Sequence, residues 1–184
     1  MRGSGKFVGC VAVSMLLVLG LVGNPAWARR PELLPNFRLL DRAGKQVQSR
    51  QLQAGERWLL VYLDPRCVPC TALLRDLKAG EFPQVPAARI VVIVRGSRAA
   101  LEETILDFPD LVPVSWYADP EGAGATALEV TVSPVVLGLQ RQKVIWAATG
   151  PLRGAARIQT LLATWLQEPV LRGRPRSSNA PASQ

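Results

Sequence analysis

Two cysteines separated by two residues form the segment of this chain best suited to chemistry. Cys67-Val68-Pro69-Cys70 follows an apolar run at residues 58–63 and precedes leucines at helical spacing. The dipole and free N–H groups at a helix start stabilise a thiolate and make it nucleophilic near neutral pH, and Arg66 would add attraction. We therefore expect Cys67 to attack disulfides and Cys70, one turn inside the helix, to resolve the mixed disulfide.

A cysteine pair of this kind has other uses besides disulfide exchange. A four-residue loop closed by a disulfide stabilises a fold by about 2 kcal/mol, against about 4.7 kcal/mol for a hundred-residue loop, so a structural staple is a poor use of the pair. Two cysteines supply half of a zinc site. Peroxidase chemistry by an activated cysteine is disfavoured, because Asp64 stands three residues before Cys67, where peroxiredoxins carry Thr or Ser. Copper(I) carriage by two thiolates stays open.

The composition excludes several classes of catalytic site. The chain has 184 residues and contains no histidine. A Ser-His-Asp triad, a Cys-His protease, a His-ligated zinc and a His-ligated haem are therefore ruled out. A hydrophobic content of 48% with 20% charged residues is sufficient for a folded core. The length is that of one domain.

The elements that must position the cysteines follow an α/β order. Apolar runs at 58–63, 89–94 and 114–117 predict strands, and a hairpin is expected within 33–48. A helix from Cys67 buries Leu73, Leu74 and Leu77 and ends near Gly80; a second, capped by Ser97, runs through Leu101, Ile105 and Leu106. A small helix at 123–128, a hairpin of 135–139 and 144–148, and a helix with Ile158, Leu161, Leu162, Trp165 and Leu166 complete the domain. This order predicts a mixed sheet flanked by helices.

The first 28 residues have the pattern of an export signal. Arg2 and Lys6 precede an uncharged segment at 7–22, and Ala26-Trp27-Ala28 follows as a cleavage site. The alternative is an uncleaved membrane anchor, although the apolar segment is shorter than the about 20 residues that span a bilayer. Cys10 is read as part of this leader. Cys67 and Cys70 would then be the two cysteines of a mature, exported chain.

The positive charge of the chain lies mainly at its ends. The net charge is +8, yet residues 31–168 hold 15 basic and 14 acidic residues. The remaining basic residues belong to the leader, to Arg29 and Arg30, and to a tail at 169–184 that we expect to be disordered. We therefore expect a domain at 29–168 whose residues 31–168 are nearly neutral and which does not bind nucleic acid.

Three features together resemble the thioredoxin-like fold: the strand at 58–63, the Cys67-Val68-Pro69-Cys70 motif on a helix, and Ser133-Pro134 opening the strand at 135–139. The leader, the opening at 34–52 and the extra strand and helix between 114 and 128 are similar to the exported TlpA- and ResA-type thiol:disulfide oxidoreductases. The resemblance implies an N-terminal hairpin, a strand-helix insertion and no bound cofactor. It also implies a cis peptide at Ser133-Pro134 that contacts substrate beside the cysteines, with Arg66 nearby.

The resemblance further implies a function in the bacterial periplasm or the thylakoid lumen. There the protein would act as a monomer that reduces disulfides of client proteins, apocytochrome c cysteines among them. A membrane thiol-disulfide protein is the expected electron donor. The alternatives are net oxidation of client thiols, and a non-catalytic module that uses the pair for copper(I) or as a structural disulfide.

Several positions depart from the family pattern. Arg66 replaces the usual Trp before the first cysteine, Val61 stands in the position of the buried thioredoxin Asp, and Leu73 replaces the ResA-type Glu. No buried acid is therefore evident to accept the proton of Cys70. Asp64 is near enough in sequence to accept the proton of Cys70, but we favour the interpretation that Asp64 is a turn residue at the end of the strand.

Overall fold

The predicted strands form one seven-stranded sheet in the computed structural model, which describes residues 33–52, 54–78, 89–111, 114–152 and 155–167. Its strands are β1 (Arg38–Asp41), β2 (Gln46–Gln48), β3 (Arg57–Leu63), β4 (Ile90–Arg95), β5 (Ser115–Asp119), β6 (Val135–Gln140) and β7 (Lys143–Thr149). The helices are α1 (Val68–Lys78), α2 (Arg98–Asp107), α3 (Ala123–Ala127) and α4 (Ala155–Gln167), with 3-10 turns η2 (Ser49–Gln51) and η4 (Pro109–Leu111).

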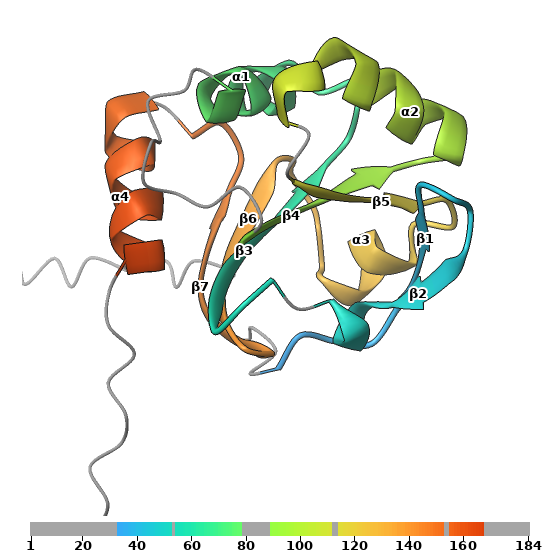
Figure 1. Cartoon of the computed structure of the whole chain (residues 1–184), viewed down its shortest axis with the longest axis horizontal. Helices are drawn as coiled ribbons and strands as arrows, with labels where there is room; N and C mark the ends of the chain where they lie inside the picture. The colour runs from blue at the N-terminus through green and yellow to red at the C-terminus, as the bar shows by residue number, and fades with distance from the viewer. Residues whose placement is uncertain (1–32, 53, 79–88, 112–113, 153–154, 168–184) are drawn as a thin grey trace, which may run out of the picture.

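The sheet is mixed, as the element order predicts. Its strand order is β2-β1-β5-β4-β3-β6-β7. Strands β3, β4 and β5 are parallel, whereas β6 and β7 on one side and β1 and β2 on the other are antiparallel. Parallel neighbours need crossover connections, and α1 and α2 lie in those crossovers. Consequently the carboxyl ends of three strands and the starts of two helices meet at one edge of the sheet (Figure 1).

Each face of the sheet buries its own apolar core, and β3 contributes to both because side chains alternate along a strand. Leu59, Val61 and Leu63 pack on the side of α1, α2 and α4, and Trp58, Leu60 and Tyr62 pack on the side of α3. Figure 1 shows the helices on these two sides of the sheet. Coverage of both faces explains why β3 reads as an unbroken apolar run.

The structure confirms most of the expected elements and corrects one detail of α2. Ser97 caps α2, its hydroxyl accepting the N–H of Ala100 at 3.3 Å. Leu106, expected on the buried side, is 77% exposed because it lies one residue beyond Ile105 and so points off the buried stripe. Phe108, just past the helix, is buried instead.

Some expectations fall outside the described residues. These are the export signal at 1–28, the tail at 169–184 and the helix stop at Gly80. No helix within the described ranges is long and apolar enough to cross a membrane.

Candidate active site at the Cys67–Cys70 disulfide

Cys67 occupies the N-cap position of α1. Four residues after β3 ends, its carbonyl accepts the N–H groups of Cys70 and Thr71 at 3.0 and 3.2 Å, which begins the helix. Its own N–H donates to the carbonyl of Asp64 at 3.1 Å. The Cys67 sulfur accepts the N–H of Cys70 at 3.1 Å, in the way that an N-cap oxygen accepts the third helical N–H. The predicted placement of Cys67 at a helix start is therefore confirmed.

The two cysteines are joined by a disulfide and differ in accessibility. The bond links Cys67 to Cys70, whose Cα atoms are 5.2 Å apart. Cys70 is 1% exposed and packs with Leu73, Leu74 and Leu77 in the core beneath α1, whereas Cys67 is half-buried. An incoming thiolate or disulfide therefore meets the Cys67 sulfur first.

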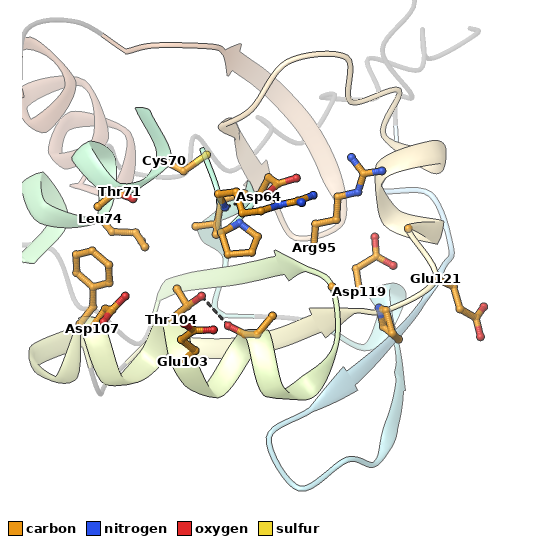
Figure 2. Close-up of a pocket in the computed structure, with 18 residues that line it drawn as sticks. Asp64, Cys70, Thr71, Leu74, Arg95, Glu103, Thr104, Asp107, Asp119 and Glu121 are labelled. Atoms are coloured by element: carbon orange, nitrogen blue, oxygen red, sulfur yellow. Dashed lines mark hydrogen bonds and ion pairs between the residues drawn. The ribbon is translucent and has the colours of Figure 1, made fainter. Parts of the chain in front are cut away.

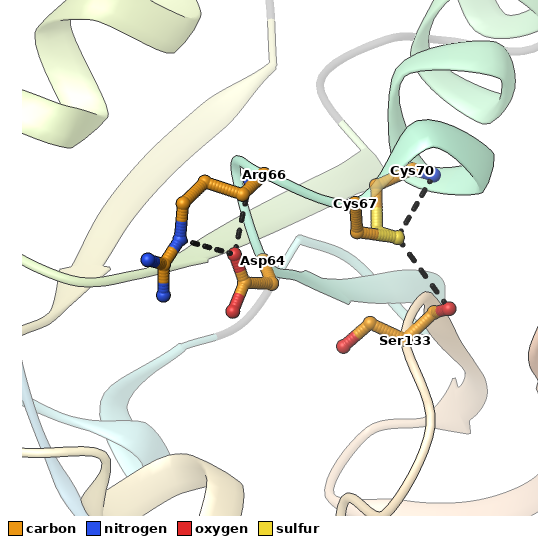
Figure 3. The surroundings of a disulfide bond; sticks show 5 residues. All are labelled: Asp64, Arg66, Cys67, Cys70 and Ser133. Carbon is orange, nitrogen blue, oxygen red and sulfur yellow. Dashed lines mark hydrogen bonds and ion pairs between the residues drawn. A yellow bond between two sulfur atoms is a disulfide. The ribbon is translucent and has the colours of Figure 1, made fainter.

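The Ser133–Pro134 segment lies directly beside the disulfide. β6 pairs with β3 in a register that sets Val135 opposite Tyr62, so the residues before β6 reach the region that follows β3. The Ser133–Pro134 peptide is cis, as predicted, and the Ser133 carbonyl oxygen lies 3.5 Å from the Cys67 sulfur (Figure 3). Val132, just before it, is 51% exposed. The sheet register thus brings together residues more than sixty positions apart.

Arg66 points away from the disulfide. Figure 3 shows its side chain alongside Asp64, with the Arg66 Nε 3.8 Å from the Asp64 Oδ1. The side chain is 92% exposed, so solvent screens its charge. The structure gives no contact between the Arg66 guanidinium and the Cys67 sulfur that would support the expected attraction of a thiolate. Arg66 lies on the same loop as Cys67 and is exposed.

Asp64 is a turn residue, as the favoured interpretation held. Its Oδ1 accepts the N–H of Arg66 at 3.0 Å, two residues along, which is the pattern of an Asx turn. Its carbonyl accepts the N–H of Cys67 in the same loop. Asp64 therefore shapes the passage from β3 into α1.

A buried carboxylate that the sequence analysis did not identify lies at the end of β5. Asp119 is 0% exposed, and its Oδ2 accepts the Tyr62 hydroxyl at 2.7 Å and the N–H groups of Gly124 and Ala125 at 2.9 and 3.1 Å. Burial, followed by the hydrogen bond to Asp119, raises the pKa of Tyr62 well above its ordinary value. The phenol therefore stays protonated and donates to the carboxylate.

Asp119 forms no hydrogen bond with Cys70 within the described residues, so the expectation that no buried acid is evident to accept the proton of Cys70 stays a prediction. Asp119 stands in an Asp119-Pro120-Glu121-Gly122 segment that is typical of a turn, and its partner Tyr62 is 57 residues away in the sequence. One signal was available. A tyrosine inside an apolar strand needs a hydrogen-bond partner for its hydroxyl.

No metal centre is evident in the described part of the chain, where no three His, Cys, Asp or Glu side chains form a group that could hold an ion. The two cysteines provide at most two sulfur ligands. The described site holds a disulfide between a half-buried cysteine, Cys67, and a buried one, Cys70.

Comparison with solved structures identifies the fold. Neither a protein-family model nor a curated protein sequence matches the chain. A secreted disulfide oxidoreductase of Mycobacterium tuberculosis, described as homologous to E. coli DsbE, is 16% identical with a TM-score of 0.55, covering 70% of this chain and 95% of that one. A thio-disulfide isomerase from Thermus thermophilus is 24% identical with a TM-score of 0.52, covering 73% and 96%.

A third similar structure is an uncharacterized thioredoxin-like protein from Porphyromonas gingivalis, 19% identical with a TM-score of 0.58, covering 75% of this chain and 94% of that one. The matched chains are covered almost entirely, so the likeness extends over a whole domain. This chain therefore has a thioredoxin-like fold, with a C-x-x-C disulfide at the start of its first helix.

Proposed function

We propose that this protein is an exported thiol:disulfide oxidoreductase in which Cys67 is the nucleophile and Cys70 the resolving cysteine. The observation that carries the proposal is the asymmetry of the disulfide. Cys67 is half-buried at the N-cap of α1 with a backbone N–H on its sulfur, and Cys70 is enclosed in the core. A structural staple requires no accessible sulfur, whereas exchange requires one.

The proposed exchange transfers two electrons to the client. In the reduced protein the Cys67 thiolate attacks one sulfur of a client disulfide, so that a Cys67–client bond forms and the other client sulfur leaves as a thiolate. The Cys70 thiolate then attacks the Cys67 sulfur. The Cys67–Cys70 bond forms, the second client sulfur leaves, and the client is reduced while the protein is oxidised. An external dithiol must reduce the pair again before the next cycle.

We propose reduction of client disulfides as the net direction. A strongly oxidising pair is one whose reduced form is stabilised, which requires strong stabilisation of the thiolate. Here one backbone N–H donates to the Cys67 sulfur, the Arg66 guanidinium lies against Asp64, and the chain has no histidine. This modest stabilisation favours a reducing potential.

Ser133, Pro134 and Arg66 are proposed to contact the client. The Ser133 carbonyl beside Cys67 offers a hydrogen-bond acceptor to an extended client segment. Export to the periplasm or thylakoid lumen, a membrane thiol-disulfide electron donor, a monomeric state and membership of the TlpA- and ResA-type branch are part of the same proposal. They are supported by the leader pattern and by the structural likeness to a secreted disulfide oxidoreductase.

Insulin reduction with dithiothreitol as the electron source tests the chemistry. The native protein should accelerate reduction, and Cys67→Ser should abolish the acceleration. Reduced Cys70→Ser, mixed with insulin after dithiothreitol has been removed, should instead accumulate a mixed disulfide with the client, visible as a mass adduct that added dithiothreitol removes. Full activity in either variant contradicts the mechanism.

Equilibration of the pair against glutathione determines the direction. A reduction potential near that of thioredoxin, about −270 mV, supports a reductant, and one near that of DsbA, about −120 mV, supports an oxidant. An inert pair that binds copper(I) tightly would favour the carrier function.

A further inference from the structure

A groove of about 590 Å³ borders the disulfide on the side of Cys70. Its walls come from the β3–α1 loop, from α1 and α2, and from the segments that follow β4 and β5. Figure 2 shows Cys70 and Thr71 at one end of the groove and Arg95, Asp119 and Glu121 at the other. Ser133 and Pro134 are not among the lining residues. The groove is therefore separate from the surface on which the cis proline lies.

The groove carries an excess of negative charge. Its lining includes five carboxylates and two guanidinium groups: Asp64, Glu103, Asp107, Asp119 and Glu121, with Arg66 and Arg95. Asp64 lies against Arg66, and Glu121 forms an exposed ion pair with Arg38 at 3.8 Å. Within the described ranges the other three carboxylates, those of Glu103, Asp107 and Asp119, form no ion pair. The one further positive charge in the lining is the guanidinium of Arg95, so the lining is negative on balance.

One carboxylate of the groove lining, Asp119, has an oxygen atom without a hydrogen-bond partner among the described residues. One oxygen, Oδ2, is saturated by three hydrogen bonds, but Oδ1 is buried without a hydrogen-bond partner among the described residues. An unpaired buried carboxylate oxygen costs free energy that a donor would recover. The groove is the lined space beside this residue, so a donor reaching Oδ1 would come through it.

We propose that the groove is a specificity subsite for a cationic side chain, an arginine or lysine of the client, whose cysteine is at Cys67 at the same moment. This inference rests on the proposed oxidoreductase function and names the client feature that the site selects. A guanidinium or ammonium supplies the donor that Oδ1 lacks, and the net negative charge of the groove lining attracts it. The client would be held at two points, its cysteine at the disulfide and its basic side chain in the groove.

The test measures thiol–disulfide exchange with short peptides. Each peptide carries one cysteine as a mixed disulfide with thionitrobenzoate, whose release is followed by absorbance, and one arginine at successive positions on either side of the cysteine. A matched peptide has glutamine in place of the arginine. With the reduced full chain at low salt, arginine at one or two neighbouring positions should raise the second-order rate constant about tenfold over glutamine. High salt should reduce the ratio.

Substitutions in the groove separate a subsite from general attraction. Asp119→Asn keeps the shape of the side chain while removing its charge, and Glu103→Gln does the same on α2 if the first variant folds poorly. Each should lower the arginine-to-glutamine ratio severalfold. Glu102→Gln is the matched control, since Glu102 is the next residue on α2 and pairs with Arg42 outside the groove. Its ratio should equal that of the native protein.

Arg95→Gln provides a change of opposite sign. Removing this positive charge from the groove should raise the rate for the arginine peptide and leave that for the glutamine peptide unchanged, an outcome that a merely structural role would not produce. A ratio below about threefold at every position overturns the subsite, and so does a ratio unchanged in both Asp119→Asn and Glu103→Gln. If the reduced protein releases thionitrobenzoate from every peptide no faster than a free small-molecule thiol does, the proposed oxidoreductase function is wrong, and the subsite proposal is wrong with it.

Discussion

The hydroxyl of Tyr62 provides a quantitative test of the buried pair with Asp119. The Tyr62 side chain is completely buried and donates to the carboxylate at 2.7 Å. Tyr62→Phe removes one of the three donors to Oδ2, in a carboxylate whose Oδ1 already has none. The aromatic ring and its packing on the α3 side of the sheet are retained.

The expected cost follows from the charge of the acceptor. A hydrogen bond to a charged group contributes about 1.5–3 kcal/mol to stability, and the carboxylate that remains cannot recover the lost donor from solvent. The cavity left by one oxygen atom adds little. We therefore expect Tyr62→Phe to lower the free energy of unfolding by about 2 kcal/mol, a large part of the 5–15 kcal/mol that is usual for a domain.

Urea unfolding at neutral pH with the disulfide intact measures this difference. The second of the two tyrosines supplies the control. Tyr117 is half-buried, and its hydroxyl forms no hydrogen bond within the described part of the chain, so Tyr117→Phe should change stability by less than about 0.5 kcal/mol. Equal effects of the two substitutions would refute the reasoning, since the loss would then reflect the hydroxyl alone and not its carboxylate partner.

Three further outcomes are expected. Above pH about 10, where a free tyrosine ionises, the folded state should lose stability because it keeps Tyr62 protonated, with a slope of up to about 1.4 kcal/mol per pH unit; the slope should be smaller in Tyr62→Phe, and an equal slope would contradict the raised pKa. Arg66→Ala should leave the rate of Cys67 alkylation by iodoacetamide in the reduced protein within about twofold, because the guanidinium is exposed and screened; a larger fall would place it at the thiolate. Gly138→Ala should lower the free energy of unfolding by about 1–3 kcal/mol, because a Cβ at this position collides with the indole of Trp146; the added substitution Trp146→Leu should recover part of the loss, and no recovery would refute the clash.

Local signals were sufficient to predict the elements and the position of the cysteine pair at a helix start. The apolar run at β3 predicted a strand covered on both faces, and the strand is inside the sheet with a core on each side. The Cys67-Val68-Pro69-Cys70 motif predicted a helix start, and α1 begins at Val68. These inferences succeeded because apolar periodicity, proline at a first helical turn and the cysteine spacing are properties of short segments.

Contacts between distant segments were beyond the reach of such signals. The loop geometry that turns Arg66 toward Asp64 depends on how β3 passes into α1. Leu106 was misplaced because its burial depends on which neighbours α2 packs against. Asp119 was missed because its partner Tyr62 lies on a strand that is not adjacent in the sequence.

The sequence by itself determined the α/β element order, the cysteine pair, the helix start at which the pair lies and the proline preceding β6. The tertiary structure decided which residues surround that pair. The register of β6 on β3 placed the Ser133 carbonyl 3.5 Å from the Cys67 sulfur, and the parallel order of β3, β4 and β5 created the groove that joins Cys70 to Asp119. Short-range spacing specifies the backbone of each segment, but strand register and strand order set the distances between segments.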